Sequence, residues 1–119
     1  MTTAAQVEVL NINGITVIRP GTDLANLFEA QLEHIAVIST LAESASPPRL
    51  IVDLQHVKVV GSAFLGRMVA ANKTIAARDG GLFALCNVST FCRSALSVSK
   101  LDTVINVQLT LDDAIRALS

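Results

Sequence analysis

Residues 53 to 66 read DLQHVKVVGSAFLG and connect a buried strand to the start of a helix. Residues 50 to 54 form an apolar run that is typical of a parallel strand covered on both faces. After the turn, apolar residues recur at helical spacing, namely Leu65, Met68, Val69, Ile75 and Ala76. Ser62 therefore stands where a helix N-cap is expected, with its hydroxyl at the positive end of the helix dipole.

The position of Ser62 allows two interpretations. A serine N-cap stabilises a helix by about 1 kcal/mol relative to alanine, and that role needs no further chemistry. A phosphate attached to the same hydroxyl would be received by the free backbone N–H groups of the first helical turn. Ser62 is therefore either a structural cap or a phosphorylation site.

The first half of the chain predicts a hairpin and a helix. Apolar residues alternate on either side of Asn13-Gly14, the strongest short signal for two antiparallel strands joined by a tight turn. Pro20-Gly21 ends the second strand, and Thr22 or Asp23 is expected to cap one long helix that ends at the break of residues 44 to 48. Its inward face would carry Leu24, Leu27, Phe28, Leu32, Ile35 and Ile38.

The second half predicts alternating helices and strands. The helix that starts at Ser62 is expected to end near Asp79, before Gly80-Gly81, and residues 82 to 86 form the next strand. Ser89 or Thr90 would cap a third helix, residues 104 to 107 would form the last strand, and Thr110 would cap a final helix. The order β-β-α-β-α-β-α-β-α predicts one α/β domain over residues 1–119, with a mainly parallel sheet and an antiparallel hairpin at its start.

Composition excludes several classes of protein. Hydrophobic residues make up 51% of the chain and charged residues 16%, which excludes a disordered protein. The net charge of −1 argues against nucleic acid as a partner. The apolar runs are far shorter than the roughly 18 residues of a membrane-spanning helix. Residues 1 to 6 lack a basic region followed by an apolar core, so no secretory signal is expected and the chain is predicted to be cytoplasmic.

The sequence offers no catalytic or metal-binding constellation, so we expect neither an enzyme nor a bound cofactor. Cys86 lies in an apolar strand-like run and Cys92 on the inward face of a helix, so both are predicted to be buried thiols. Neither a disulfide nor a metal pair is expected, because no CxxC motif or histidine partner spacing accompanies them. The two histidines lie in unrelated segments, which argues against zinc. The chain also lacks the G-x-S-x-G elbow of serine hydrolases and the glycine-rich loops that bind nucleotide phosphates.

The block around Ser62 resembles the signature of the STAS domain, the fold of bacterial anti-sigma factor antagonists. There the strand is followed by roughly D-L-x-x-V-x-x-x-D-S-[ST]-G-L-G, and the serine after the second Asp is the phosphorylation site. Gly61, Ala63 and Phe64 replace the Asp, the second hydroxyl residue and the Gly of that pattern. The order of elements is also that of the STAS domain, so the resemblance covers nearly the whole chain. The matching positions are Asp53-Leu54, Val57, Ser62, Leu65 and Gly66.

The resemblance implies a partner-switching function. Unmodified, the surface around Ser62 would bind a serine kinase that also restrains a sigma factor, and the sigma factor would be freed. The kinase, with its own ATP and magnesium, would phosphorylate Ser62 and separate from it, and a serine/threonine phosphatase would reset the protein. The residues expected to contact the partner are Thr22, Asp23, Lys58, Gly61, Ala63, Phe64 and Thr90.

Each of these residues also allows an interpretation in which it has only a structural role. Gly61 suits the backbone of a strand-to-helix turn, and Lys58 suits a solvated turn. Phe64 lies outside the predicted inward stripe of its helix, so it is either an incidental exposed residue or an anchor for a partner. Two other functions also remain: a non-switching STAS scaffold subunit of a sensory or transport assembly, and a small-ligand binder that holds an anion at its helix N-termini.

Overall fold

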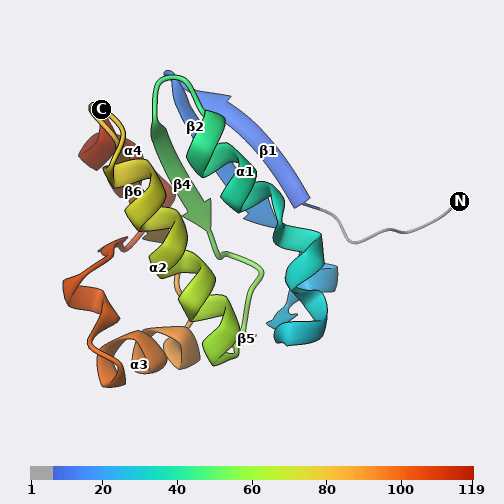
Figure 1. Cartoon of the computed structure of the whole chain (residues 1–119). Coiled ribbons are helices and arrows are strands. Elements are labelled where there is room, and N and C mark those ends of the chain that lie inside the picture. The colour runs from blue at the N-terminus through green and yellow to red at the C-terminus, as the bar shows by residue number, and fades with distance from the viewer. Residues whose placement is uncertain (1–6) are drawn as a thin grey trace, which may run out of the picture.

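The computed structural model describes residues 7–119 and shows a five-stranded sheet with helices on both faces (Figure 1). The strand order is β1-β2-β4-β6-β7; β1 and β2 are antiparallel, and the remaining neighbours are parallel. The predicted fold class is therefore confirmed. The expectation about a secretory signal lies outside the described residues. The strands are β1 (Val7–Ile12), β2 (Ile15–Pro20), β4 (Arg49–Asp53), β6 (Leu82–Cys86) and β7 (Asn106–Gln108).

The hairpin forms where the sequence places it. Ile12 pairs with Ile15, and the turn between them holds Asn13 at φ 54° and Gly14 at φ 81°. Two consecutive positive φ angles are what a tight hairpin turn requires, and Asn-Gly adopts them at low cost.

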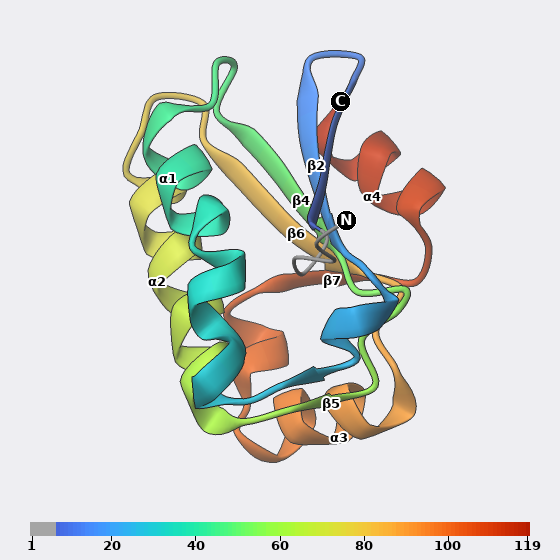
Figure 2. The ribbon, with the colours of Figure 1, turned by 90° about the vertical axis from the view of Figure 1, so that its right-hand side faces the viewer.

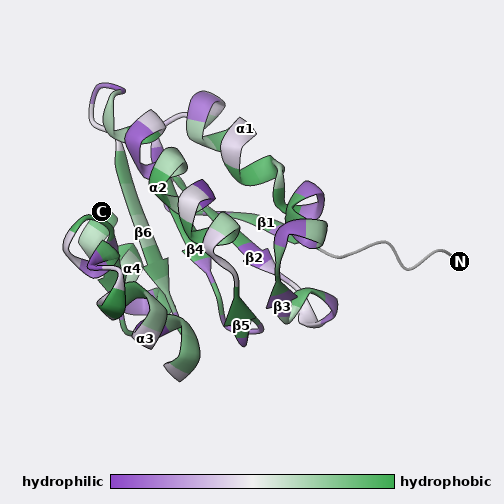
Figure 3. Cartoon of the chain, turned by 60° about the horizontal axis from the view of Figure 1, so that its bottom comes forward, coloured by the Kyte–Doolittle hydropathy of each residue, from purple (hydrophilic) through white to green (hydrophobic). Residues whose placement is uncertain are grey.

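Two helical layers enclose the sheet (Figure 2). Helices α1 (Val37–Ser44) and α2 (Ser62–Ala76) cover one face, and α4 (Leu111–Leu118) covers the other. Alternate residues of β4 and β6 point to opposite layers: Leu50, Val52, Phe83 and Leu85 to the first, and Ile51, Ala84 and Cys86 to the second. Both faces of the sheet are therefore covered from solvent at these strands, and this explains why their sequences are continuously apolar. Figure 3 shows this apolar character along β6.

Two helix caps lie where the sequence predicts them. The Ser89 hydroxyl accepts a hydrogen bond from the Cys92 N–H at 3.2 Å and begins α3 (Thr90–Val98). Thr110 Oγ1 accepts from the Asp113 N–H at 3.1 Å and begins α4. Each cap satisfies one N–H group that the first helical turn leaves without an internal partner.

The single long helix expected after Pro20 is wrong. The segment instead forms a 3₁₀ turn at Thr22–Leu24, strand β3 (Asn26–Leu27), a 3₁₀ helix at Glu29–Ile35 and then α1. The strand forms because it pairs in parallel with β5 (Val59–Val60), just before α2. Leu24 and Leu27 are buried as expected, but the break turns Phe28 outward, and its side chain is 46% exposed.

The last strand begins later than expected. Leu101–Thr103 form a 3₁₀ turn, and Val104 is left 55% exposed before β7 starts at Asn106. Within residues 7–119, no helix combines the length and apolar character needed to cross a membrane.

The turn after α2 supplies a test of the fold. A Cβ atom at Gly81 would lie 1.6 Å from the carbonyl oxygen of Ile75, so Gly81→Ala forces the backbone apart. We expect a loss of about 3 kcal/mol or more in the free energy of unfolding, measured by urea denaturation. Gly66→Ala is the control: it adds a Cβ to an exposed helical position with nothing within 4 Å and should stabilise the protein by about 0.5–1 kcal/mol. Equal effects of the two substitutions would contradict this packing.

Candidate functional site

The loops at the carboxyl edge of the sheet are joined through their backbones. The Lys58 N–H donates to the Ala25 carbonyl at 2.7 Å, and the Gly61 N–H donates to the Leu27 carbonyl at 2.9 Å. On the other side, the Ser89 hydroxyl donates to the Lys58 carbonyl at 2.9 Å. The segment that leads to Ser62 is thus held between the loop after β2 and the start of α3.

Ser62 is exposed at the start of α2 but does not cap it. The N-cap is Gly61, whose carbonyl accepts from the N–H groups of Phe64 at 3.1 Å and Leu65 at 3.3 Å. The predicted N-cap role of Ser62 is therefore wrong by one residue, because extended backbone ends at Gly61 (φ −96°, ψ 170°). Within residues 7–119 the Ser62 hydroxyl has no hydrogen-bond partner.

The first turn of α2 offers hydrogen-bond donors beside that hydroxyl. The N–H groups of Ser62 and Ala63 precede the first intrahelical hydrogen bond, which Phe64 donates. Such groups carry the positive end of the helix dipole and favour a nearby anion. The site therefore combines an exposed, unengaged hydroxyl with a backbone suited to negative charge.

Phe64 belongs to the core and is not an exposed anchor. Its side chain is 1% exposed. The buried face of α2 consists of Phe64, Met68, Ala71 and Ile75, whereas Leu65 and Val69 lie at its margin. The sequence pattern placed the inward stripe about one residue too far along the helix, and for that reason the interpretation of Phe64 as exposed is wrong.

Phe28 is an exposed aromatic residue beside Ser62, and the sequence analysis did not predict it. A Cβ atom at Gly61 would lie 3.1 Å from Cδ1 of Phe28, so the ring lies against the residue that precedes Ser62. Its periodic place among Leu24, Leu27 and Leu32 indicated a buried position. Phe28 is exposed instead because the segment before it forms strand β3, which pairs with β5 over two residues and interrupts the expected helix.

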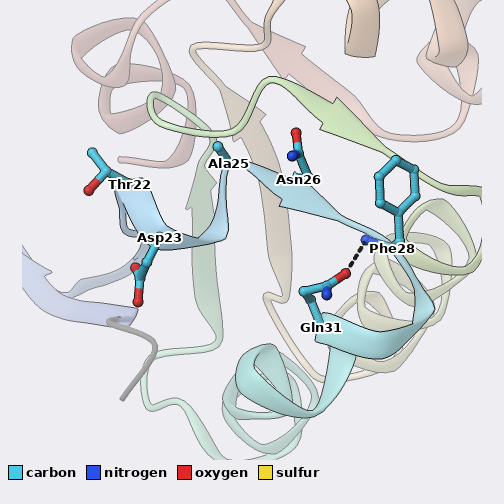
Figure 4. Close-up of a pocket in the computed structure, with 6 residues that line it drawn as sticks. All are labelled: Thr22, Asp23, Ala25, Asn26, Phe28 and Gln31. Atoms are coloured by element: carbon cyan, nitrogen blue, oxygen red, sulfur yellow. Dashed lines mark hydrogen bonds between the residues drawn. The ribbon is translucent and has the colours of Figure 1, made fainter. Parts of the chain in front are cut away.

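An open pocket of about 380 Å³ lies beside the Phe28 ring (Figure 4). Thr22 and Asp23 lie at one end and Phe28 at the other, and the Gln31 side chain accepts a hydrogen bond from the Phe28 N–H at 3.2 Å. The remaining lining residues are Ala25 and Asn26.

The other predicted contact residues lie around the same edge. Thr22, Asp23, Lys58 and Thr90 are exposed, whereas Gly61 and Ala63 are half-buried. Ala63 also packs against the core. These residues come from three loops, and the backbone bonds described above bring those loops together.

Beneath the loops lies a fully buried carboxylate, Asp53. Its Oδ2 accepts from Arg19 Nε at 2.9 Å, and its Oδ1 accepts from Asn87 Nδ2 at 2.9 Å and from the Gln55 N–H at 3.0 Å. Arg19 also contacts Glu8 of β1 at 2.9 Å. The hydrogen bond to Asp53 raises the pKa of Arg19, which is stabilised as a cation.

Both cysteines are free and buried, as expected. Burial, followed by the charge of Asp53, raises the pKa of the Cys86 thiol to about 12. Burial also raises the pKa of Cys92. Within the described part of the chain, no group of three or more His, Cys, Asp or Glu residues is placed to hold a metal ion.

Comparisons with known proteins show the family and the fold of the chain. The model of the STAS domain family matches residues 6–114. An anti-sigma-factor antagonist (STAS) domain protein from Planctomyces limnophilus is 31% identical, with a TM-score of 0.87 over 94% of this chain and 97% of that one. No curated protein matches the sequence.

Two more distant structures share the fold. An anti-sigma factor antagonist from Mycobacterium paratuberculosis is 22% identical, with a TM-score of 0.83 over 97% of this chain and 94% of that one. The anti-sigma factor antagonist SpoIIAA in its unphosphorylated form is 20% identical, with a TM-score of 0.67 over 97% of both chains.

Arg19 contacts two carboxylates, Asp53 and Glu8, and we expect their removal to lower the stability of the protein by different amounts. Asp53→Ala leaves Arg19 and Asn87 without their acceptor and should lower the free energy of unfolding by about 2–4 kcal/mol. Glu8→Ala removes the outer partner, which is 56% exposed, and should cost less than about 1 kcal/mol. Urea denaturation of both variants measures the difference, and comparable losses would refute the buried role of Asp53.

Cys86 predicts a pH dependence of stability. The unfolded thiol ionises near pH 9, whereas the folded thiol keeps its proton until about pH 12. Between these values the folded state holds a proton that the unfolded state has lost, so stability falls as pH rises, by up to about 1.4 kcal/mol per pH unit. Denaturation on both sides of pH 9 should give a shallower slope for Cys86→Ala than for the wild type. Identical slopes would exclude this contribution.

Proposed function

Because the chain belongs to the STAS domain family, we propose that it is an anti-sigma factor antagonist that works by partner switching. With Ser62 unmodified, it binds an anti-sigma factor that is also a serine kinase, and it releases that partner once Ser62 is phosphorylated. The observation that carries this proposal is the exposed Ser62 hydroxyl at the first turn of α2, which makes no hydrogen bond within residues 7–119.

The added charge affects the free protein and the complex differently. A phosphate brings roughly −1.5 to −2 charges at neutral pH. In the free protein, the N–H groups of Ser62 and Ala63 can donate hydrogen bonds to the phosphate, with a gain of about 0.3–1 kcal/mol at an exposed helix terminus. In a closed complex the same charge loses its water, which costs several kcal/mol without a matched partner. A loss of about 4 kcal/mol weakens binding about a thousandfold.

The site suits a switch that acts at its surface. Backbone hydrogen bonds from Lys58 and Gly61 fix the approach to Ser62, so a phosphate there changes the surface charge and leaves the fold intact. The kinase supplies ATP and magnesium, and a serine/threonine phosphatase removes the phosphate. In this mechanism the chain provides the serine that is phosphorylated and the surface that binds the partner, and it catalyses no reaction itself. We place this exchange in the cytoplasm.

A second candidate is a non-switching scaffold subunit of a sensory or transport assembly. The observation that favours it is the apolar character of the tip, where Gly61 precedes Ser62 and the Phe28 ring lies beside it. An apolar tip suits a lasting protein contact.

Phosphorylation in vitro separates the two candidates. We expect the protein, incubated with ATP, magnesium and the candidate anti-sigma kinases of its own genome, to gain the mass of one phosphate. Ser62→Ala should block the gain and keep kinase binding, while Ser62→Asp should weaken binding. Ser94→Ala, at an exposed serine of α3, is the matched control and should be phosphorylated like the wild type. Intact-mass spectrometry and calorimetry supply the readouts.

The scaffold candidate makes the opposite prediction. If Ser62→Ala and Ser62→Asp both bind every partner with wild-type affinity, and no kinase adds phosphate, then the switching mechanism is excluded.

A further inference from the structure

The Phe28 ring holds an exposed position that the core does not require. Its neighbour Leu27 is fully buried and fills the space under the β3–β5 pair, whereas Phe28 is 46% exposed. Its backbone is held on both sides: the Leu27 carbonyl accepts from the Gly61 N–H at 2.9 Å, and the Gln31 side chain accepts from the Phe28 N–H at 3.2 Å. The fold therefore presents this ring from a fixed backbone at the surface.

The ring and the switch serine share one small area. Gly61, which immediately precedes Ser62, would bring a Cβ to 3.1 Å from Phe28 Cδ1. A contact of that length is tighter than ordinary packing, so a side chain at position 61 requires the ring to shift by a few tenths of an ångström. A protein interface of ordinary size covers about 800 Å² on each partner. A partner that covers Ser62 therefore also covers Phe28.

We propose that Phe28 is the apolar anchor by which the serine kinase recognises the Ser62 surface, and that Gly61 keeps its ring in position. This proposal rests on the proposed partner-switching function and adds a specificity residue to it. Aromatic residues, Phe included, are enriched in protein interfaces, because one ring buries a large apolar area. Phosphorylation then places its charge beside the most strongly desolvated contact of the complex.

The surroundings of the ring indicate the chemistry of the partner. The exposed charged side chains of residues 22 to 33 are acidic, namely Asp23, Glu29 and Glu33. The neighbouring loop adds one exposed basic residue, Lys58, whose N–H donates to the Ala25 carbonyl, so the surroundings of the ring carry an excess of negative charge. A complementary face has an apolar hollow for the Phe28 ring and a rim of Lys or Arg. The occupant is thus the kinase that binds at Ser62, with a basic rim around an apolar pocket.

A double-mutant cycle tests the anchor and its support. The dissociation constant of the unphosphorylated chain and its kinase is measured by calorimetry for Phe28→Ala, Gly61→Ala and the double variant. We expect Phe28→Ala to weaken binding at least thirtyfold. Gly61→Ala should weaken it about tenfold alone, because it displaces the ring, and less than twofold when Phe28 is already Ala. Phe28→Leu, which keeps apolar bulk, should restore part of the affinity.

Leu82→Ala is the matched control, because Leu82 is an exposed apolar residue (43%) at the start of β6, at the end of the sheet opposite the Ser62 loops, and should change affinity less than twofold. Thermal unfolding verifies that each variant is folded. If Phe28→Ala binds like Leu82→Ala while phosphorylation of Ser62 still releases the kinase, the anchor is refuted and the switch stands. If no kinase binds or phosphorylates the wild type, both proposals fail. If Phe28→Ala instead dissolves a homodimer, the ring serves a second copy of this chain and the assignment to a kinase is overturned.

Discussion

The buried carboxylate of Asp53 fixes the edge of the sheet from which the functional loops project. It lies at the end of β4 and accepts hydrogen bonds from Arg19 in β2, from Asn87 after β6 and from the backbone of Gln55. Three consecutive strands of the sheet are thus joined at their carboxyl ends by one anion. A carboxylate without water is tolerated only when its lone pairs are engaged, so the ends of these strands are fixed relative to one another.

Hydrogen bonds to the backbone connect this edge of the sheet to the loops at the surface. Ser89, two residues after Asn87, donates to the Lys58 carbonyl, and the residues after Lys58 pair with β3. The start of α2 is therefore positioned by hydrogen bonds from two flanking loops. In the proposed switch, the free energy of one added charge at Ser62 therefore acts on the contact with the partner and not on a rearrangement of the fold.

The sequence predicted what strong local patterns encode. The Asn13-Gly14 turn, the caps at Ser89 and Thr110 and the buried parallel strands each rest on residue types with a direct structural cause. The predictions were wrong where a segment adopts its structure by pairing with another segment that is far away in the sequence. The strands β3 and β5 are two residues long and have no period of their own, so the broken helix and the outward Phe28 could not be foreseen.

Around Ser62 the errors were small but changed the roles of residues. The helix starts at the predicted place, but Gly61 takes the N-cap, which frees the Ser62 hydroxyl. Phe64 and Leu65 are both apolar, so the sequence pattern did not reveal that the buried face passes through Phe64. The region of the site was thus predictable, whereas its aromatic member was not, because Phe28 reaches it only through tertiary pairing.

The contact between Phe28 and Gly61 also constrains how this protein can evolve. A larger residue at position 61 meets the ring, so the side chain tolerated at one position depends on the size of the side chain at the other. We therefore expect substitutions at positions 28 and 61 to be energetically coupled, with a small residue at one position accommodating a larger one at the other.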